Sequence, residues 1–134
     1  MCFTIDENAK RPRRTSAYKI VDLYEHSGRL RSAFYPKAGQ DWNTPGGIVR
    51  RDKGPTKERR QKNNYCASYQ VADHGIYVYN NLWMIYPSYF QVILKVLVNP
   101  LDWICSSKDG LASTYEKVII AEDQPEIEWY GKLD

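Results

Sequence analysis

The sequence predicts a single α+β domain, with a mixed or antiparallel sheet of five to six strands and one short helix. The main observation is the stretch 91–100, in which four of ten residues are β-branched and Lys95 is the only charge. β-Branched residues fit a pleated surface better than they fit a helix. Apolar residues stand at odd and even positions alike, so we expect a central strand covered on both faces, with Val96 buried.

Two further runs have the composition of strands. Residues 75–79 precede the central stretch, and residues 115–121 follow it; both are rich in valine, isoleucine and tyrosine. Between them, residues 80–90 contain few strong helix formers but have the length for a short helix that bridges two strands. Residues 101–105 are expected to form a bent segment at an edge of the sheet.

A β-hairpin is predicted over residues 18–35. Its first strand is 17–24, a turn follows at Ser27 and Gly28, and the second strand is 29–35. The second strand alternates strictly, so one side packs while the other presents two guanidinium groups and a phenol, from Arg29, Arg31 and Tyr35.

The 134 residues are expected to form one domain. Residues 1–16 look like a basic N-terminal arm that adds nothing to the core, because four positive charges surround Pro12 and apolar residues are few. Residues 17–134 form the domain, which includes a long basic loop at 36–64 that is rich in glycine and proline. Within that loop, Ile48 and Val49 can form a short strand.

The sequence argues against several classes of protein. No apolar run is long enough for a membrane-spanning helix, and the N-terminus lacks the apolar segment of a secretory leader. Three cysteines give no even disulfide framework, which favours a reducing cytoplasm. No paired-cysteine zinc motif and no phosphate-binding glycine loop is present, so we expect no metal and no cofactor.

Charge is distributed unevenly along the chain. Up to Lys62 there are 15 Lys and Arg against 7 Asp and Glu, whereas the rest has 4 against 9. The first half therefore carries a charge of +8 and the second −5, within a net charge of +3. Either the two halves neutralise each other in the folded protein, or the basic half binds an anionic partner.

The candidate binding residues are arginines of the basic half and aromatic residues near them. Guanidinium groups hold phosphates and carboxylates in pairs of hydrogen bonds, and rings can stack on bases. Trp42 either folds back onto the core or stacks on a ligand. Tyr77 and Tyr79 stand on one sheet face, which Arg29 and Arg31 would share if their strand were a neighbour. The full set is Arg29, Arg31, Tyr35, Trp42, Arg50, Arg51, Arg59, Arg60, Tyr77 and Tyr79.

Asp73, His74 and Gly75 form the triplet that looks most like a catalytic site. A histidine beside a carboxylate at the start of a strand could act as acid or base, although such a loop histidine more often has a structural role.

The order of these signals resembles small accessory proteins of bacteriophages and prophages. The matching segments are the Met-Cys start, the Tyr-Lys strand at 17–21, the Gly-Arg-Leu-x-Ser step at 28–32, the Gly-Ile-x-Val strand at 75–78 and the closing Lys-Val strand at 117–120. Where that pattern often has histidine, this chain has Tyr77. The resemblance implies a phage setting and, with it, the cytoplasm of a host cell.

From these observations we expect a non-enzymatic binding protein, a phage-encoded inhibitor of host defence of the anti-CRISPR kind. It would act on a protein or a nucleic-acid-handling complex through a basic, aromatic surface. One alternative is sequestration of a nucleotide signal, and another is a small enzyme that uses His74 and Asp73 as an acid–base pair. The sequence leaves open whether the protein is a homo-oligomer.

Overall fold

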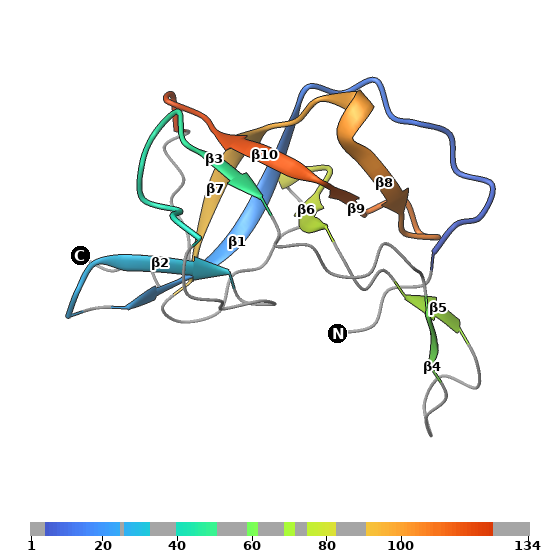
Figure 1. The fold of residues 1–134 in the computed structure, drawn as a ribbon, viewed down its shortest axis with the longest axis horizontal. Helices are drawn as coiled ribbons and strands as arrows, with labels where there is room; N and C mark the ends of the chain where they lie inside the picture. Colours follow the sequence, from blue (N-terminus) through green and yellow to red (C-terminus); the bar gives the residue numbers. More distant parts are fainter. Residues whose placement is uncertain are drawn as a thin grey trace.

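The structure is a computed structural model (Figure 1), and it describes residues 5–24, 26–32, 40–50, 59–61, 69–71, 75–82 and 91–124. Within these residues it has ten strands and a short 3-10 helix, η2 (Pro100–Asp102). The strands are β1 (Ser16–Tyr24), β2 (Arg29–Ser32), β3 (Ile48–Arg50), β4 (Arg59–Gln61), β5 (Tyr69–Val71), β6 (Ile76–Tyr79), β7 (Gln91–Leu97), β8 (Trp103–Ser106), β9 (Ala112–Tyr115) and β10 (Lys117–Ile120).

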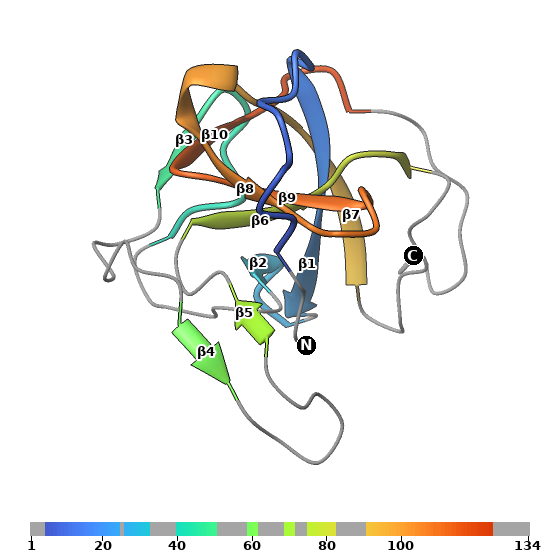
Figure 2. The same cartoon turned by 90° about the vertical axis from the view of Figure 1, so that its right-hand side faces the viewer.

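The predicted α+β class is wrong, because the described chain is an antiparallel β structure. Eight strands form one sheet in the order β3-β10-β7-β1-β6-β9-β8, with β2 as a second neighbour on β1. β4 and β5 pair only with each other; Figure 1 draws them apart from the large sheet, at the lower right, and in Figure 2 they lie at the lower left. The expected helix over 80–90 falls mostly on residues outside the description. In the described part of the chain, no helix is long and apolar enough to cross a membrane.

The strands beyond the five or six that were predicted are short, and they are defined by pairing with neighbouring strands. β3 has three residues, and a short strand was predicted at two of them, Ile48 and Val49; β9 has four residues, too few for a periodic pattern to stand out in the sequence. The single strand predicted over 115–121 is divided at Glu116: residues before it pair with β6 and β8, and residues after it pair with β3 and β7. One run of the chain therefore serves two distant parts of the sheet.

The prediction of a buried central strand at 91–100 is confirmed. β7 pairs with β1 over seven successive residues and with β10 on its other edge. Val96 is fully buried in the main core, and Ile93 is buried in a separate cluster on the opposite face. We call the side of the sheet that carries Val96 the core face, and the side that carries Ile93 the outer face.

The core face holds the largest apolar cluster. Its buried residues come from six strands and two loops, and they are Ala17, Val21, Trp42, Val49, Ile76, Val78, Val96, Val98, Tyr115, Val118 and Ile120. Trp42 is only 1% exposed, so its ring is part of the core, the first of the two roles that the sequence left open. Burial of such a ring removes more apolar surface from water than any aliphatic side chain.

The predicted hairpin is confirmed at its start. β1 and β2 pair antiparallel from Val21 opposite Ser32 to Tyr24 opposite Arg29. Gly28 lies in the turn with φ of 67°, a left-handed conformation that suits glycine. Residues 33–35 lie outside the description.

The N-terminal segment contributes to the core, contrary to prediction. Ile5 is 7% exposed and packs with Cys105 and Ala112 on the outer face. Ile5 also forms a bridge with Ser107, and the Asp6 N–H donates to the Ser106 carbonyl at 3.0 Å. The segment therefore covers the edge of β8, whose free backbone groups could otherwise pair with another chain.

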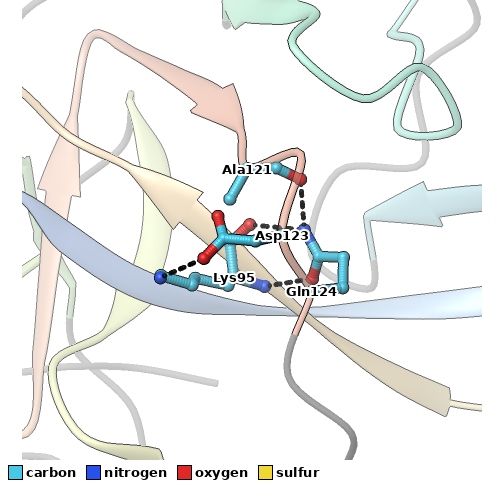
Figure 3. A network of polar contacts seen from close by, with 4 residues as sticks. All are labelled: Lys95, Ala121, Asp123 and Gln124. Atoms are coloured by element: carbon cyan, nitrogen blue, oxygen red, sulfur yellow. Dashed lines mark hydrogen bonds and ion pairs between the residues drawn. The ribbon is translucent and has the colours of Figure 1, made fainter.

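A side-chain amide continues the sheet beside β7, where β10 ends (Figure 3). The Lys95 N–H donates to Gln124 Oε1 at 2.8 Å, and Gln124 Nε2 donates to the Lys95 carbonyl at 3.0 Å. The carboxamide thus makes the two bonds that a neighbouring strand would make. Lys95 Nζ pairs with Asp123 at 3.3 Å, which neutralises the one charge of this strand.

We expect Val96→Asp to abolish folding, because it would place a carboxylate without a partner in the main core. Leu97→Asp is the matched control: Leu97 is the next residue, points to the outer face and is 41% exposed. Circular dichroism and size exclusion should show a folded monodisperse Leu97→Asp protein. A well-folded Val96→Asp protein would contradict the placement of β7.

Gly75 and Gly110 allow a second comparison. Both have positive φ, 91° and 75°, so alanine should cost about 1 kcal/mol at either from backbone strain. At Gly75 a Cβ would also lie 2.7 Å from Ile104 Cδ1 and 3.2 Å from the Tyr115 carbonyl, whereas at Gly110 it meets nothing within 4 Å. Urea unfolding should therefore show a loss for Gly75→Ala larger by about 1 to 3 kcal/mol. Equal losses would contradict the crowding at Gly75.

Candidate functional site

Arginines and tyrosines gather on the outer face of the sheet, where β6, β1 and β2 meet. In the register of β1 with β2, Arg31 stands opposite Asp22 and Arg29 opposite Tyr24. On the same edge of β1, Tyr18 stands opposite Tyr79 of β6. Directly opposed residues point to the same side, and so do residues two apart on one strand. We call this set, Tyr18, Tyr24, Arg29, Arg31 and Tyr79, the arginine–tyrosine face.

The two arginines differ in how firmly they are held. The Arg31 guanidinium carbon lies 4.9 Å from the centre of the Tyr24 ring, close enough for a cation–π interaction. Its Nε is buried, and no hydrogen bond to it is found in the described structure. Arg29 is exposed, and Asn43 binds the backbone on both sides of it, at Gly28 O and Leu30 N. Arg31 is thus an oriented cation, whereas Arg29 is exposed and interacts electrostatically with Asp41.

Asp22 places one negative charge on this face. Its Oδ1 accepts from Gln91 Nε2 at 3.0 Å. The carboxylate stands opposite Arg31 in the register, so part of the positive charge there is offset within the protein. The Thr44 hydroxyl and the Asn43 N–H lower the pKa of the Asp41 carboxyl, and the charge of Arg29 acts in the same direction, so Asp41 offsets part of the charge of Arg29 as well.

Tyr79 of the arginine–tyrosine face also contacts Tyr77, which lies two residues before it on β6. Their ring centroids are 5.5 Å apart with an interplanar angle of 77°, an edge-to-face pair. Burial raises the pKa of both phenols, and the negative charge of Asp109 acts in the same direction. Both rings pack against the Ile5 cluster, so these hydroxyls stay protonated and can donate hydrogen bonds at neutral pH.

Lys19 is the functional candidate that the sequence did not reveal. It is 2% exposed and shares the core face with Ala17 and Val21. Its Nζ lies 5.9 Å from the ring centres of both Trp42 and Tyr77. Burial lowers the pKa of the ammonium group to about 7, although the charge of Asp22 works against this shift. In the sequence, a lysine between Tyr18 and Ile20 indicates a solvent-facing position, which is why it was missed.

A network of buried polar side chains lies where β8 and β9 contribute to the core face. Ser113 Oγ lies 2.8 Å from Ser106 Oγ and donates to Asn80 Oδ1 at 3.2 Å. Trp103 Nε1 donates to Ser106 Oγ at 2.9 Å. A register shift between Trp103 and Cys105 makes this contact possible, because a bulge brings Trp103 and Ser106 to the same side. These bonds join β8 and β9 to the residue that follows β6, and we assign the network a structural role.

The other predicted site residues lie in other strands or outside the described residues. Arg50 is exposed at the end of β3, in a different part of the sheet from Arg29 and Arg31. Arg59 and Arg60 belong to β4, of which only the backbone is described. Tyr35, Arg51, Asp73 and His74 lie outside the described residues. Over the described ranges, no three His, Cys, Asp or Glu side chains group as metal ligands would.

Comparisons with protein-family models, with curated proteins and with solved structures gave no match. A function for this chain therefore has to be argued from its own residues.

The burial of Lys19 predicts how stability depends on pH. The unfolded lysine keeps its proton up to about 10.5 and the folded one only up to about 7, so the unfolded state binds more protons between these values. The free energy of unfolding should therefore rise with pH from about 7.5 to 9.5, by at most about 1.4 kcal/mol per pH unit. Below pH 7 this contribution should be constant.

Two lysine variants isolate the effect in urea unfolding. Lys19→Met should remove the rise that Lys19 causes and stabilise the protein at pH 7, because an apolar chain of similar length replaces a buried cation. Lys95→Met, at a partly exposed lysine paired with Asp123, should keep the wild-type slope. The same slope in wild type and Lys19→Met would show that Lys19 is not buried as described.

Proposed function

We propose that this chain is a non-enzymatic binding protein that holds a single-stranded nucleic acid, free or within a nucleic-acid-handling complex, on its arginine–tyrosine face. The observation that carries the proposal is the register of β1, which brings Arg29 and Arg31 of β2 to the same side as Tyr18 and Tyr79. Guanidinium groups bind phosphates, and aromatic rings stack on bases without regard to sequence.

The two kinds of side chain suit different parts of such a ligand. Arg29 is exposed and can follow a phosphate group, while Arg31 is already oriented over Tyr24. Tyr24 is 45% exposed, so part of its ring remains available to a base. An oriented guanidinium loses less side-chain entropy on binding than a free one, which favours Arg31 as the anchor.

The setting is proposed from the resemblance to phage accessory proteins. In a host cell, a protein with this face would act as an inhibitor of defence by binding the nucleic acid that a defence complex has to hold. Sequestration of a nucleotide signal would use the same chemistry, a phosphate on arginine and a base on tyrosine. Competition between a single strand and a nucleotide distinguishes these two ligands.

The test is binding of a fluorescein-labelled single-stranded DNA of about 20 nucleotides, measured by anisotropy at two salt concentrations. Arg29→Glu with Arg31→Glu should weaken binding at least about tenfold and reduce the salt slope by roughly 1 to 2, because two phosphate contacts are lost. Arg50→Glu with Lys117→Glu makes the same charge change elsewhere on the sheet and should have a much smaller effect.

Three results would change the conclusion. Equal losses in the two double variants would mean that only net charge matters, and no binding by wild type would remove nucleic acid as the ligand. Displacement of the DNA by ATP at about 1 mM would favour a nucleotide over a strand. Circular dichroism of each variant shows whether the fold is retained.

A further inference from the structure

A second region of the outer face carries a row of exposed aliphatic side chains. Ile48 of β3 stands opposite Ile119 of β10, and Ile119 stands opposite Leu97 of β7. Their exposed fractions are 58%, 36% and 41%. Single exposed apolar residues are common on proteins, but these three are direct neighbours across three strands. We call them the aliphatic row.

Two cations stand beside this row without an acidic partner. Arg50 and Lys117 are directly opposite each other. They are two residues along their strands from Ile48 and Ile119, and so they lie on the same side of the sheet. Like charges in opposed positions destabilise a sheet. Among the residues that the structure describes, no carboxylate forms an ion pair with either. At the other end of the row the protein does neutralise its cation, since Lys95 pairs with Asp123.

Other apolar parts of the outer face are covered by the chain itself. Ile5 packs over Cys105 and Ala112 beside β8 and β9, and Leu82 packs against Ile20 and Ile93. In the described part of the chain, no apolar cluster includes the aliphatic row, although the row lies on the same face of the same sheet. An open apolar row beside two unneutralised cations is complementary to an apolar surface that carries carboxylates.

We propose that the aliphatic row, with Arg50 and Lys117, is a docking surface for an extended, acidic segment of a partner protein. This surface is separate from the arginine–tyrosine face and does not depend on it. An extended segment places residues i and i+2 on one side about 6.7 Å apart, which is also the spacing between Lys117 and Ile119 along β10. A glutamate two residues from an apolar residue would thus meet both features at once.

The probe is a short fluorescein-labelled peptide in which glutamate, isoleucine and valine occupy every second position, with serine or threonine between them. A peptide of the same composition, with glutamate and the apolar residues on opposite sides, is the matched control. We expect anisotropy to show binding of the first peptide to wild type, and at least about tenfold weaker binding of the second.

Protein variants locate the contact. Ile48→Thr with Ile119→Thr should weaken binding at least about tenfold, and so should Arg50→Glu with Lys117→Glu. Thermal unfolding of these variants should be close to wild type, because the changed side chains are exposed or partly exposed. Arg29→Glu with Arg31→Glu should leave peptide binding unchanged. A peptide with lysine in place of glutamate should bind the Arg50→Glu, Lys117→Glu protein better than it binds wild type.

Several results would overturn the proposal. These are equal binding of the two peptides, an equal loss in the Arg29→Glu, Arg31→Glu protein, and no binding up to about 1 mM. Self-association that the Ile48→Thr, Ile119→Thr variant abolishes in sedimentation would assign the row to a second copy. Displacement of the probe by a peptide of residues 122–134, which include Glu126, Glu128 and Tyr130, would assign it to the chain's own sequence.

Discussion

The pairing of β1 is the constraint on which the rest of this structure depends. One edge of β1 pairs with β7 over seven successive residues, and the other edge is shared between β6 at Tyr18 and β2 from Val21 onward. Because side chains alternate along a strand, this register decides at once what is core and what is surface. In this register Ala17 and Val21 pack in the main cluster of the core face. Tyr18 and Tyr24 lie on the outer face, where they contact residues of two other strands.

Some of this could be predicted from the sequence, because the physical signal is local. The β-branched composition of 91–97 indicates a strand, apolar residues at both parities indicate burial on both faces, and a turn at Ser27 and Gly28 indicates a hairpin. β3 could be predicted only as a short strand at Ile48 and Val49, and β9 gives no such signal, since its pairing with β6 and β8 defines it. The α+β class was wrong for the same reason, because short segments without periodicity were interpreted as loops.

The candidate sites show the same limit more strongly. Strict alternation around Arg29 and Arg31 was enough to place them on one side of a strand. That Tyr79 shares this side follows only from a pairing between residues 18 and 79, which no local pattern encodes. The aliphatic row is built from three segments, each of which contributes one side chain. The burial of Lys19 could not be predicted because a charge in a strand usually faces water, whereas here Lys19 lies on the core face and is 2% exposed.

The burial of Lys19 depends on which register β1 adopts. The odd positions of β1 hold Ala17, Lys19, Val21 and Leu23, and the even ones hold Tyr18, Ile20, Asp22 and Tyr24, so the two sides are similarly apolar. Hydrophobic pattern alone would therefore tolerate a slip by one residue. The tight turn at Gly28 limits the slip from one end, since it fixes Tyr24 opposite Arg29. A slip would also bring Asp22 to the core face and Lys19 outside, so either register would bury one charged group. The turn therefore decides that the buried group is Lys19, and the same turn sets the arginine–tyrosine face.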